Sequence, residues 1–134
     1  MKLFDLEVSS FGPTTALAEK LGLHPVAIRV TGSTRLPYYP GGKDLTVKLL
    51  ADSADGRLLG AQLIGEEGAT LRANFASMAA HLGLTDQEFA EIETCYSPPL
   101  APVWDPVTIA AQALLRKLKG TVTAKTGPVA VEGR

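Results

Sequence analysis

The sequence predicts one domain that combines helices with a β-sheet, and three observations support that class. The chain has 134 residues, of which 46% are hydrophobic, and this is enough to close a single core. Two β-rich runs, 45–52 and 57–65, flank Asp55 and Gly56, a pair that is typical of a tight hairpin turn. Apolar side chains recur at helical spacing between residues 66 and 82.

The composition disfavours several classes of function. Thirteen basic and fourteen acidic side chains give a net charge of −1, so the surplus of cations typical of nucleic-acid binding is missing. No apolar run approaches the roughly 18 residues of a membrane span, and no secretory signal opens the sequence. The single Cys can form no internal disulfide, which is typical of a reducing compartment. We therefore expect a cytoplasmic protein that binds neither nucleic acid nor membrane.

The sequence also lacks the usual cofactor and metal motifs. A dinucleotide site of the common kind needs GxGxxG at a turn between strand and helix, and that pattern is missing. No two candidate metal ligands stand at a helical or CxxC spacing. We expect no metal site and no flavin or nicotinamide site in this chain.

The first third of the chain predicts a strand, a short helix and a second strand. Residues 4–8 alternate in polarity, as in a short strand or extended arm. Gly12 and Pro13 are predicted to open a helix, with proline at its first position, and Gly22 is placed to end it. The next strand begins at Pro25, and one of its faces carries Val26, Ile28 and Val30.

The helix predicted over residues 66–82 carries two apolar stripes on nearly opposite sides. We expect the large apolar stripe to pack on the domain's own core. The alanine stripe lets another backbone come close, so we expect it to face a second helix or, preferably, a second subunit. The large apolar stripe is Leu71, Phe75, Met78 and Leu82, and the alanine stripe is Ala69, Ala73, Ala76 and Ala80.

The C-terminal third predicts two more helices. Thr85 and Glu88 have the form of a capping box that opens a short helix, and residues 93–104 are irregular. Asp105 and Pro106 are predicted as the cap and first residue of a last helix, which Gly120 ends. Its buried face is predicted to carry Val107, Ala111, Leu114 and Leu118. We expect a domain over 1–119 and a flexible tail over 120–134.

All three tyrosines lie in the two proline-rich irregular segments, 32–44 and 93–104. Tyr38 and Tyr39 share the first segment and Tyr96 lies in the second. A tyrosine has a rigid apolar body and one polar tip, which suits a ligand pocket or an interface. The alternative is that these side chains only fix their loops to the core. Cys95 could serve as a nucleophile, but a lone Cys is more often a small buried hydrophobe.

Over residues 2–118 the sequence resembles a known family. The segments that carry the resemblance are RLPYYPGG, GRLLGAQLIGEEG and CYSPPLAPVWDPV. They are similar to the C-terminal dimerisation domain of FAD-dependent pyridine nucleotide-disulfide oxidoreductases. The first and third point to the branch that contains coenzyme A disulfide reductases and NADH oxidases.

The resemblance implies an α+β fold, with an antiparallel sheet flanked by helices, that dimerises and completes its partner's active site. It implies that FAD and NAD(P)H belong to other domains of the parent enzyme, so this chain is not catalytic alone. Tyr96 and one of Tyr38 or Tyr39 would reach the partner's active-site Cys and its coenzyme A, with Arg35 beside an anionic ligand. The partner would be a second copy or a separate flavoprotein subunit.

Two departures from the family pattern affect the second loop. Cys95 stands where relatives usually carry Ala, and Leu100, Ala101 and Pro102 replace an aromatic residue followed by small polar ones. Two alternative functions follow from the residues. One is a binding module for a coenzyme A-like compound without redox activity, and the other is a thiol enzyme based on Cys95.

Overall fold

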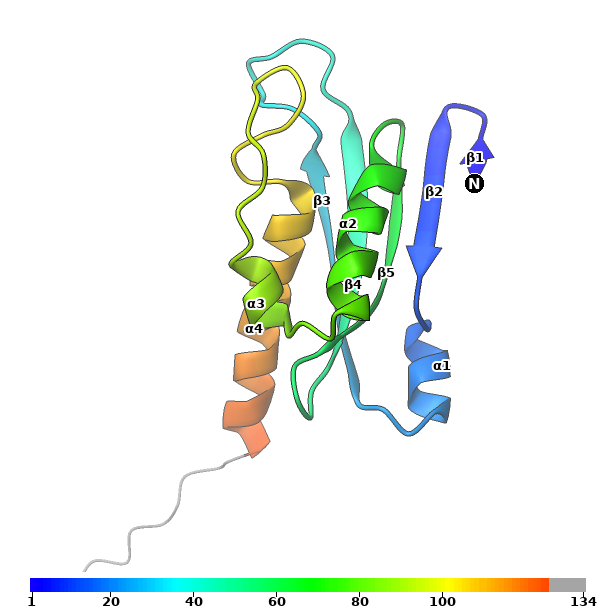
Figure 1. The fold of residues 1–134 in the computed structure, drawn as a ribbon, viewed down its shortest axis with the longest axis vertical. Helices are drawn as coiled ribbons and strands as arrows, with labels where there is room; N and C mark the ends of the chain where they lie inside the picture. Colours follow the sequence, from blue (N-terminus) through cyan, green and yellow to red (C-terminus); the bar gives the residue numbers. More distant parts are fainter. Residues whose placement is uncertain (126–134) are drawn as a thin grey trace, which may run out of the picture.

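The structure is a computed structural model that describes residues 1–125, with side chains described as far as residue 121. It has the predicted α+β class: one five-stranded antiparallel sheet, ordered β1-β2-β5-β4-β3, with helices packed on it (Figure 1). The strands are β1 (Lys2–Leu3), β2 (Leu6–Phe11), β3 (Pro25–Ser33), β4 (Asp44–Asp52) and β5 (Leu58–Gly65). The helices are α1 (Thr15–Lys20), α2 (Ala69–His81), α3 (Asp86–Ala90) and α4 (Pro106–Lys125).

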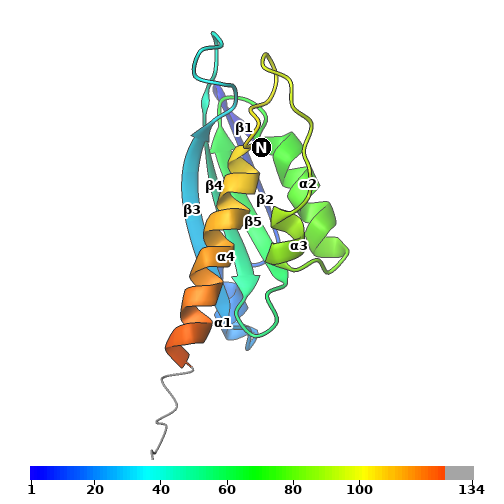
Figure 2. The ribbon, with the colours of Figure 1, turned by 90° about the vertical axis from the view of Figure 1, so that its left-hand side faces the viewer.

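The core lies between the sheet and one layer of helices. Helices α2, α3 and α4 cover the same face of the sheet, as Figure 2 shows. Alternate residues of β4 and β5 point into this layer and meet the inner faces of α2 and α4, as period-two strands require. The large side chains at the centre are fully buried, and they include Leu45, Val47, Leu49, Leu63 and Leu114.

The predicted hairpin is confirmed. β4 and β5 pair in antiparallel register from Leu45↔Gly65 onward, with an irregularity between Leu50 and Ala51. Gly56 in the turn has φ +76°, a conformation that side-chain-bearing residues rarely adopt.

Helix α1 lies on the other face of the sheet. The chain crosses from β2 to α1 directly over Gly60, where an added Cβ would lie 2.7 Å from the Phe11 carbonyl oxygen. Only glycine permits this close approach. The prediction that Pro13 begins the helix is wrong: Thr14 is the cap, and its side chain accepts from the Leu17 N–H. A hydroxyl that satisfies a free N–H is a stronger start signal than proline alone.

The predicted orientation of α2 is wrong. Ala69, Ala73 and Ala76, together with Ala79, are buried in the core, and Ala80 is partly buried. The alanine stripe therefore packs within the same chain, on β5 and β2, and is not available to a partner. Small side chains let the helix lie close to the sheet. Three residues of the large apolar stripe face outward instead: Leu71, Met78 and Leu82 are 76%, 58% and 67% exposed. The fourth, Phe75, is partly buried and packs on the core as predicted.

The second half of the helical layer largely follows the prediction. Both bonds of the capping box between Thr85 and Glu88 are present. Asp105 Oδ1 accepts from the Val107 N–H at 3.0 Å, so Asp105 caps α4. The prediction that Gly120 ends α4 is wrong, because the helix continues to Lys125. The predicted tail at 120–134 thus overlaps α4, and its residues 126–134 lie outside the described part.

The edge strand β3 is held by a cation from the helical layer. Lys117 Nζ on α4 donates to the Ala27 carbonyl oxygen at 2.8 Å. This bond uses a backbone acceptor on the side of β3 that has no neighbouring strand. No helix of the described residues is long and apolar enough to cross a membrane.

Candidate functional site

The two tyrosine-bearing segments lie side by side at one end of the sheet (Figures 1 and 2). The first tyrosine loop, residues 34–43, joins β3 to β4, and the second, residues 93–104, joins α3 to α4. The first is closed by a bond from the Thr34 N–H to the Lys43 carbonyl at 2.8 Å. The second has its own turn, in which the Ala101 N–H donates to the Ser97 carbonyl at 2.7 Å.

The structure brings Tyr38 and Tyr96 together across these loops. A side-chain hydrogen bond to Tyr96 raises the pKa of the Tyr38 phenol above its ordinary value. Such a shift means that the neighbouring phenol favours the protonated form of Tyr38. Both side chains are more than half exposed, and the side chain of Tyr39 is 36% exposed. The phenols therefore sit on the surface, where a partner can reach them.

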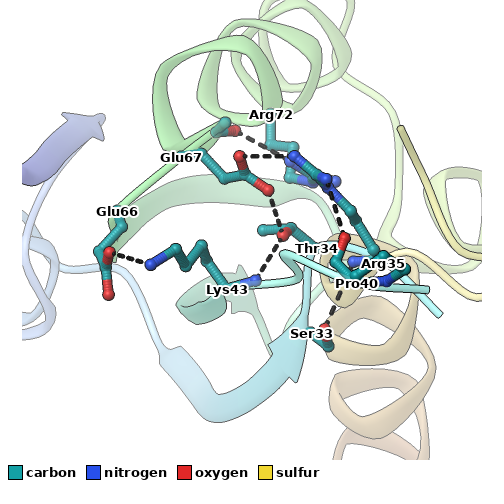
Figure 3. Close-up of polar contacts among 9 residues, drawn as sticks. Ser33, Thr34, Arg35, Pro40, Lys43, Glu66, Glu67 and Arg72 are labelled. Carbon is teal, nitrogen blue, oxygen red and sulfur yellow. Dashed lines mark hydrogen bonds and ion pairs between the residues drawn. The ribbon is translucent and has the colours of Figure 1, made fainter. Parts of the chain in front are cut away.

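The first tyrosine loop is anchored by a carboxylate, which Figure 3 shows in close-up. Thr34 is buried, donates from Oγ1 to Glu67 Oε1 at 2.7 Å and accepts from the Lys43 N–H at 3.0 Å. Arg35 Nη2 donates to the other oxygen, Glu67 Oε2, at 3.2 Å, and Nη1 donates to the Pro40 carbonyl. The bond from Thr34 and then the guanidinium of Arg35 lower the pKa of Glu67.

These contacts assign Arg35 a partner within the chain. Its guanidinium spans Glu67 and the loop backbone, and its side chain is about one quarter exposed. The role predicted for it, beside an anionic ligand, stays a prediction. Such a ligand would have to share the guanidinium with Glu67.

The second tyrosine loop is anchored by a buried ion pair. Arg72 on α2 donates from Nε to Asp105 Oδ2 at 2.7 Å, and its Nη1 reaches the Gly68 carbonyl at 3.3 Å. Both side chains are at least 86% covered. The pair fixes the C-terminal end of the loop to the helix that carries the large apolar stripe.

Sequence reasoning missed both anchors. Glu66 and Glu67 read as carboxylates at the start of a helix, but α2 begins after Gly68, and they bind Lys43 and the first tyrosine loop instead. Asp105 was identified only as a cap. The cap uses only Oδ1 of Asp105, so Oδ2 still needs a partner. That unused oxygen is the signal in the sequence that a cation lies nearby, and the cation is Arg72.

Two surface cavities adjoin the loops. One, of about 320 Å³, is lined by Arg35, Arg72 and Leu100 among others, and the other, of about 520 Å³, by Leu71, Phe75 and Cys95 among others. Cys95 is exposed, so the interpretation of it as a buried hydrophobe is wrong. Within residues that the structure describes, no three His, Cys, Asp or Glu side chains gather as metal ligands would.

The strands described do not build the common type of FAD or NAD(P) site. Every strand pair in residues 1–125 is antiparallel, whereas that site is built on parallel strands joined through a helix. The site offers phenol donors on two anchored loops. Phenols can orient a ligand or a thiolate by hydrogen bonding.

The architecture defines the class of the protein. Its fold matches that of a segment of a NAD-dependent persulfide reductase from A. fulgidus, with a TM-score of 0.85 and 29% identity over 90% of this chain and 22% of that one. It matches a segment of reduced Bacillus anthracis CoADR-RHD with the same TM-score and 24% identity, over 94% and 24% of the two chains. The chain is thus an α+β domain of the kind found in these reductases.

Sequence comparison identifies the family. The model of the pyridine nucleotide-disulphide oxidoreductase dimerisation domain matches residues 1–106, and the chain belongs to this family. It is 36% identical over 118 residues to an NADH oxidase of Methanocaldococcus jannaschii, covering 87% of this chain and 26% of that protein. It is 32% identical over 99 residues to the coenzyme A disulfide reductase of Staphylococcus aureus, covering 74% and 22%. The chain spans about a quarter of the length of these relatives.

Proposed function

We propose that this chain is a dimerisation module that pairs through the outer face of α2 and has no catalytic activity of its own. The observation that carries the proposal is the exposure of Leu71, Met78 and Leu82 on that helix. Large apolar side chains that line one face are costly in water, and they mark a surface that another protein covers. The family to which the chain belongs is a dimerisation-domain family.

The apolar surface extends beyond the helix. Leu100, Val103 and Trp104 of the second tyrosine loop are also more than half exposed. A stable interface of standard size buries roughly 800 Å² per subunit, which one helix face and one loop together can supply. If a second copy binds here, a two-fold axis would pair the same patch with itself.

We further propose that the two tyrosine loops serve the active site of a flavoprotein partner. Tyr38, Tyr39 and Tyr96 would present their phenols to a thiolate or thioester there, with FAD and NAD(P)H held by that partner. The named relatives include an NADH oxidase and a coenzyme A disulfide reductase, so thiol or disulfide chemistry is the favoured reaction class. The neighbouring positions of Tyr38 and Tyr96 support this role because they place two phenols on one surface.

Sedimentation of the chain at micromolar concentration tests the dimer. We expect a dimer for the native chain and a monomer for Met78→Lys, because a cation would be buried at the contact. Met78 is exposed in the single chain, so the variant should fold normally. The matched control is Leu21→Lys, an exposed apolar residue at the end of α1 on the other face of the sheet. The proposal would be refuted if the native chain were a monomer, or if Met78→Lys and Leu21→Lys weakened the dimer equally.

A second candidate, binding of a coenzyme A-like compound, draws support from the 320 Å³ cavity beside Arg35 and Arg72. Ligand that binds only the folded state raises its melting temperature. We would measure thermal unfolding with and without coenzyme A. A shift that Arg35→Gln abolishes would support this candidate, and an unchanged melting temperature at millimolar ligand would exclude it.

A further inference from the structure

The face of the sheet opposite α2, α3 and α4 carries two cations that stand directly opposite each other. Arg29 on β3 pairs in register with Lys48 on β4, and Lys48 in turn pairs with Gln62 on β5. Their neighbours Val30, Val47 and Leu63 point to the core, so Arg29, Lys48 and Gln62 share the outer face. We call these three residues the cationic row.

The two cations of the cationic row form no ion pair within the described residues. None of the four ion pairs of residues 1–125 includes Arg29 or Lys48. The carboxylates on β4, Asp44 and Asp52, lie four residues from Lys48 in either direction, about 13 Å along an extended strand. Like charges directly opposite each other on a sheet disfavour the pairing, and an anion placed between them would offset this effect.

A second row, formed by Thr31, Thr46 and Ile64, lies beside the cationic row and adds hydroxyl and apolar groups. Thr31 and Thr46 share a hydrogen bond of 2.8 Å between their Oγ1 atoms, and Ile64, next in register, is 41% exposed. All residues of the two rows except Thr31 line a shallow hollow of about 400 Å³, together with Val8 and Leu63. Helix α1, which reaches this face after the crossing over Gly60, packs on β3 and leaves the hollow open.

We propose that this face docks an acidic segment of a partner protein. Its carboxylates would pair with Arg29 and Lys48, and its apolar side chains would cover Ile64. A mixed surface of this kind suits a protein segment better than a small anion, because a small anion would leave Ile64 exposed. By register these side chains point away from the core that α2 covers, so the site is independent of the proposed dimer contact.

The probe is a hexaglutamate peptide titrated into the full chain and followed by amide NMR. We expect salt-dependent shifts confined to the two rows, and at least tenfold weaker binding in the double variant Arg29→Gln, Lys48→Gln. The matched control is Lys20→Gln, Arg116→Gln, which removes the same charge from exposed helical positions and should bind as the native chain does. The first double variant should also melt no lower than the native chain at low salt, since it removes a repulsion.

Several results would overturn the proposal. Shifts scattered over other basic residues, or equal weakening by the control pair, would mean a general charge effect. Tighter binding of inorganic pyrophosphate or of a DNA oligonucleotide at the same amides would assign the face to a different ligand. A lower melting temperature for the Arg29→Gln, Lys48→Gln variant would mean that these two side chains stabilise the fold and do not serve as a docking site. Sedimentation of the same variant would separate this inference from the dimer, which it should leave intact.

Discussion

Arg72 on α2 and Asp105, the cap of α4, join the two helices through a 2.7 Å contact between Nε and Oδ2. Asp105 thereby performs two functions, because its other oxygen caps α4 through the Val107 N–H. The pair ties the second tyrosine loop to the surface on which we expect a partner to pack.

Breaking this pair should cost more than a surface ion pair would. Arg72→Met leaves the nearly buried Asp105 carboxylate without its cation, and we expect a loss of about 3 kcal/mol in the free energy of unfolding. Asp105→Asn in the same background keeps the cap and removes the charge, so it should restore part of the loss. Denaturant unfolding of the two single variants and the double variant measures the coupling. Additive losses would contradict the prediction.

The Thr34–Glu67 contact predicts an acid-sensitive loop. The pKa of Glu67 is lowered in the folded state, so its bonds contribute stability above the ordinary carboxyl pKa. That contribution should be lost as the pH falls through the lower folded-state value. We expect the Lys43 amide, which donates to Thr34, to lose its protection from exchange, measured against the intrinsic rate at each pH, in this range. In the Glu67→Gln variant the Lys43 amide should be unprotected at every pH. In the Thr34→Ser variant, which keeps the hydroxyl, the same amide should behave as it does in the native chain.

Asp86 predicts the opposite pH dependence. It is fully buried, both carboxylate oxygens lack a hydrogen-bond partner, and burial raises its pKa to about 7. The unfolded state ionises near the ordinary value of 3.8 while the folded state stays neutral, so stability should fall from about pH 4 to about pH 7 and then level off. The shift corresponds to at most about 4 kcal/mol.

Replacing the carboxyl tests this directly. Asp86→Leu should raise the free energy of unfolding at pH 8 and remove most of the slope between pH 4 and pH 7. Asp44→Ala, which removes an exposed carboxylate, should leave the slope unchanged. Chemical denaturation at several pH values measures both, and an unchanged slope in Asp86→Leu would show that another group is responsible.

The tyrosine pair predicts a spectroscopic signature. Tyr96→Phe removes the hydrogen-bond partner that raises the pKa of Tyr38, so Tyr38 should ionise at lower pH than in the native chain. Ultraviolet titration of phenolate formation measures the change. Tyr39→Phe is the control and should leave the Tyr38 titration unaltered. A shift of equal size in both variants would mean that the loops do not hold the pair.

Local sequence signals predicted most of the fold. The β4–β5 hairpin, the capping box at Thr85 and the cap at Asp105 were predicted correctly, because each depends on residues close in sequence. The same signals placed all three tyrosines on two irregular loops. The family resemblance added the class of fold.

The parts that failed depend on distant contacts. α2 is apolar on two sides, so periodicity alone could not show which stripe faces the sheet. The small side chains of Ala73 and Ala76 let the helix pack close to the sheet, and this contact determines its orientation. Gly120 lies inside α4, although it reads as a stop signal. The Glu67 and Arg72 anchors join segments more than 30 residues apart. No local pattern marks which charged side chains meet at that range.

The bond from Lys117 to the Ala27 carbonyl bears on how the protein avoids uncontrolled polymerisation. A nine-residue outer strand with free amides and carbonyls is a template on which foreign strands can add. Any strand that approached β3 would first have to displace the ammonium group and then bury it without water, which is unfavourable. Addition of foreign strands to β3 is therefore disfavoured at this position.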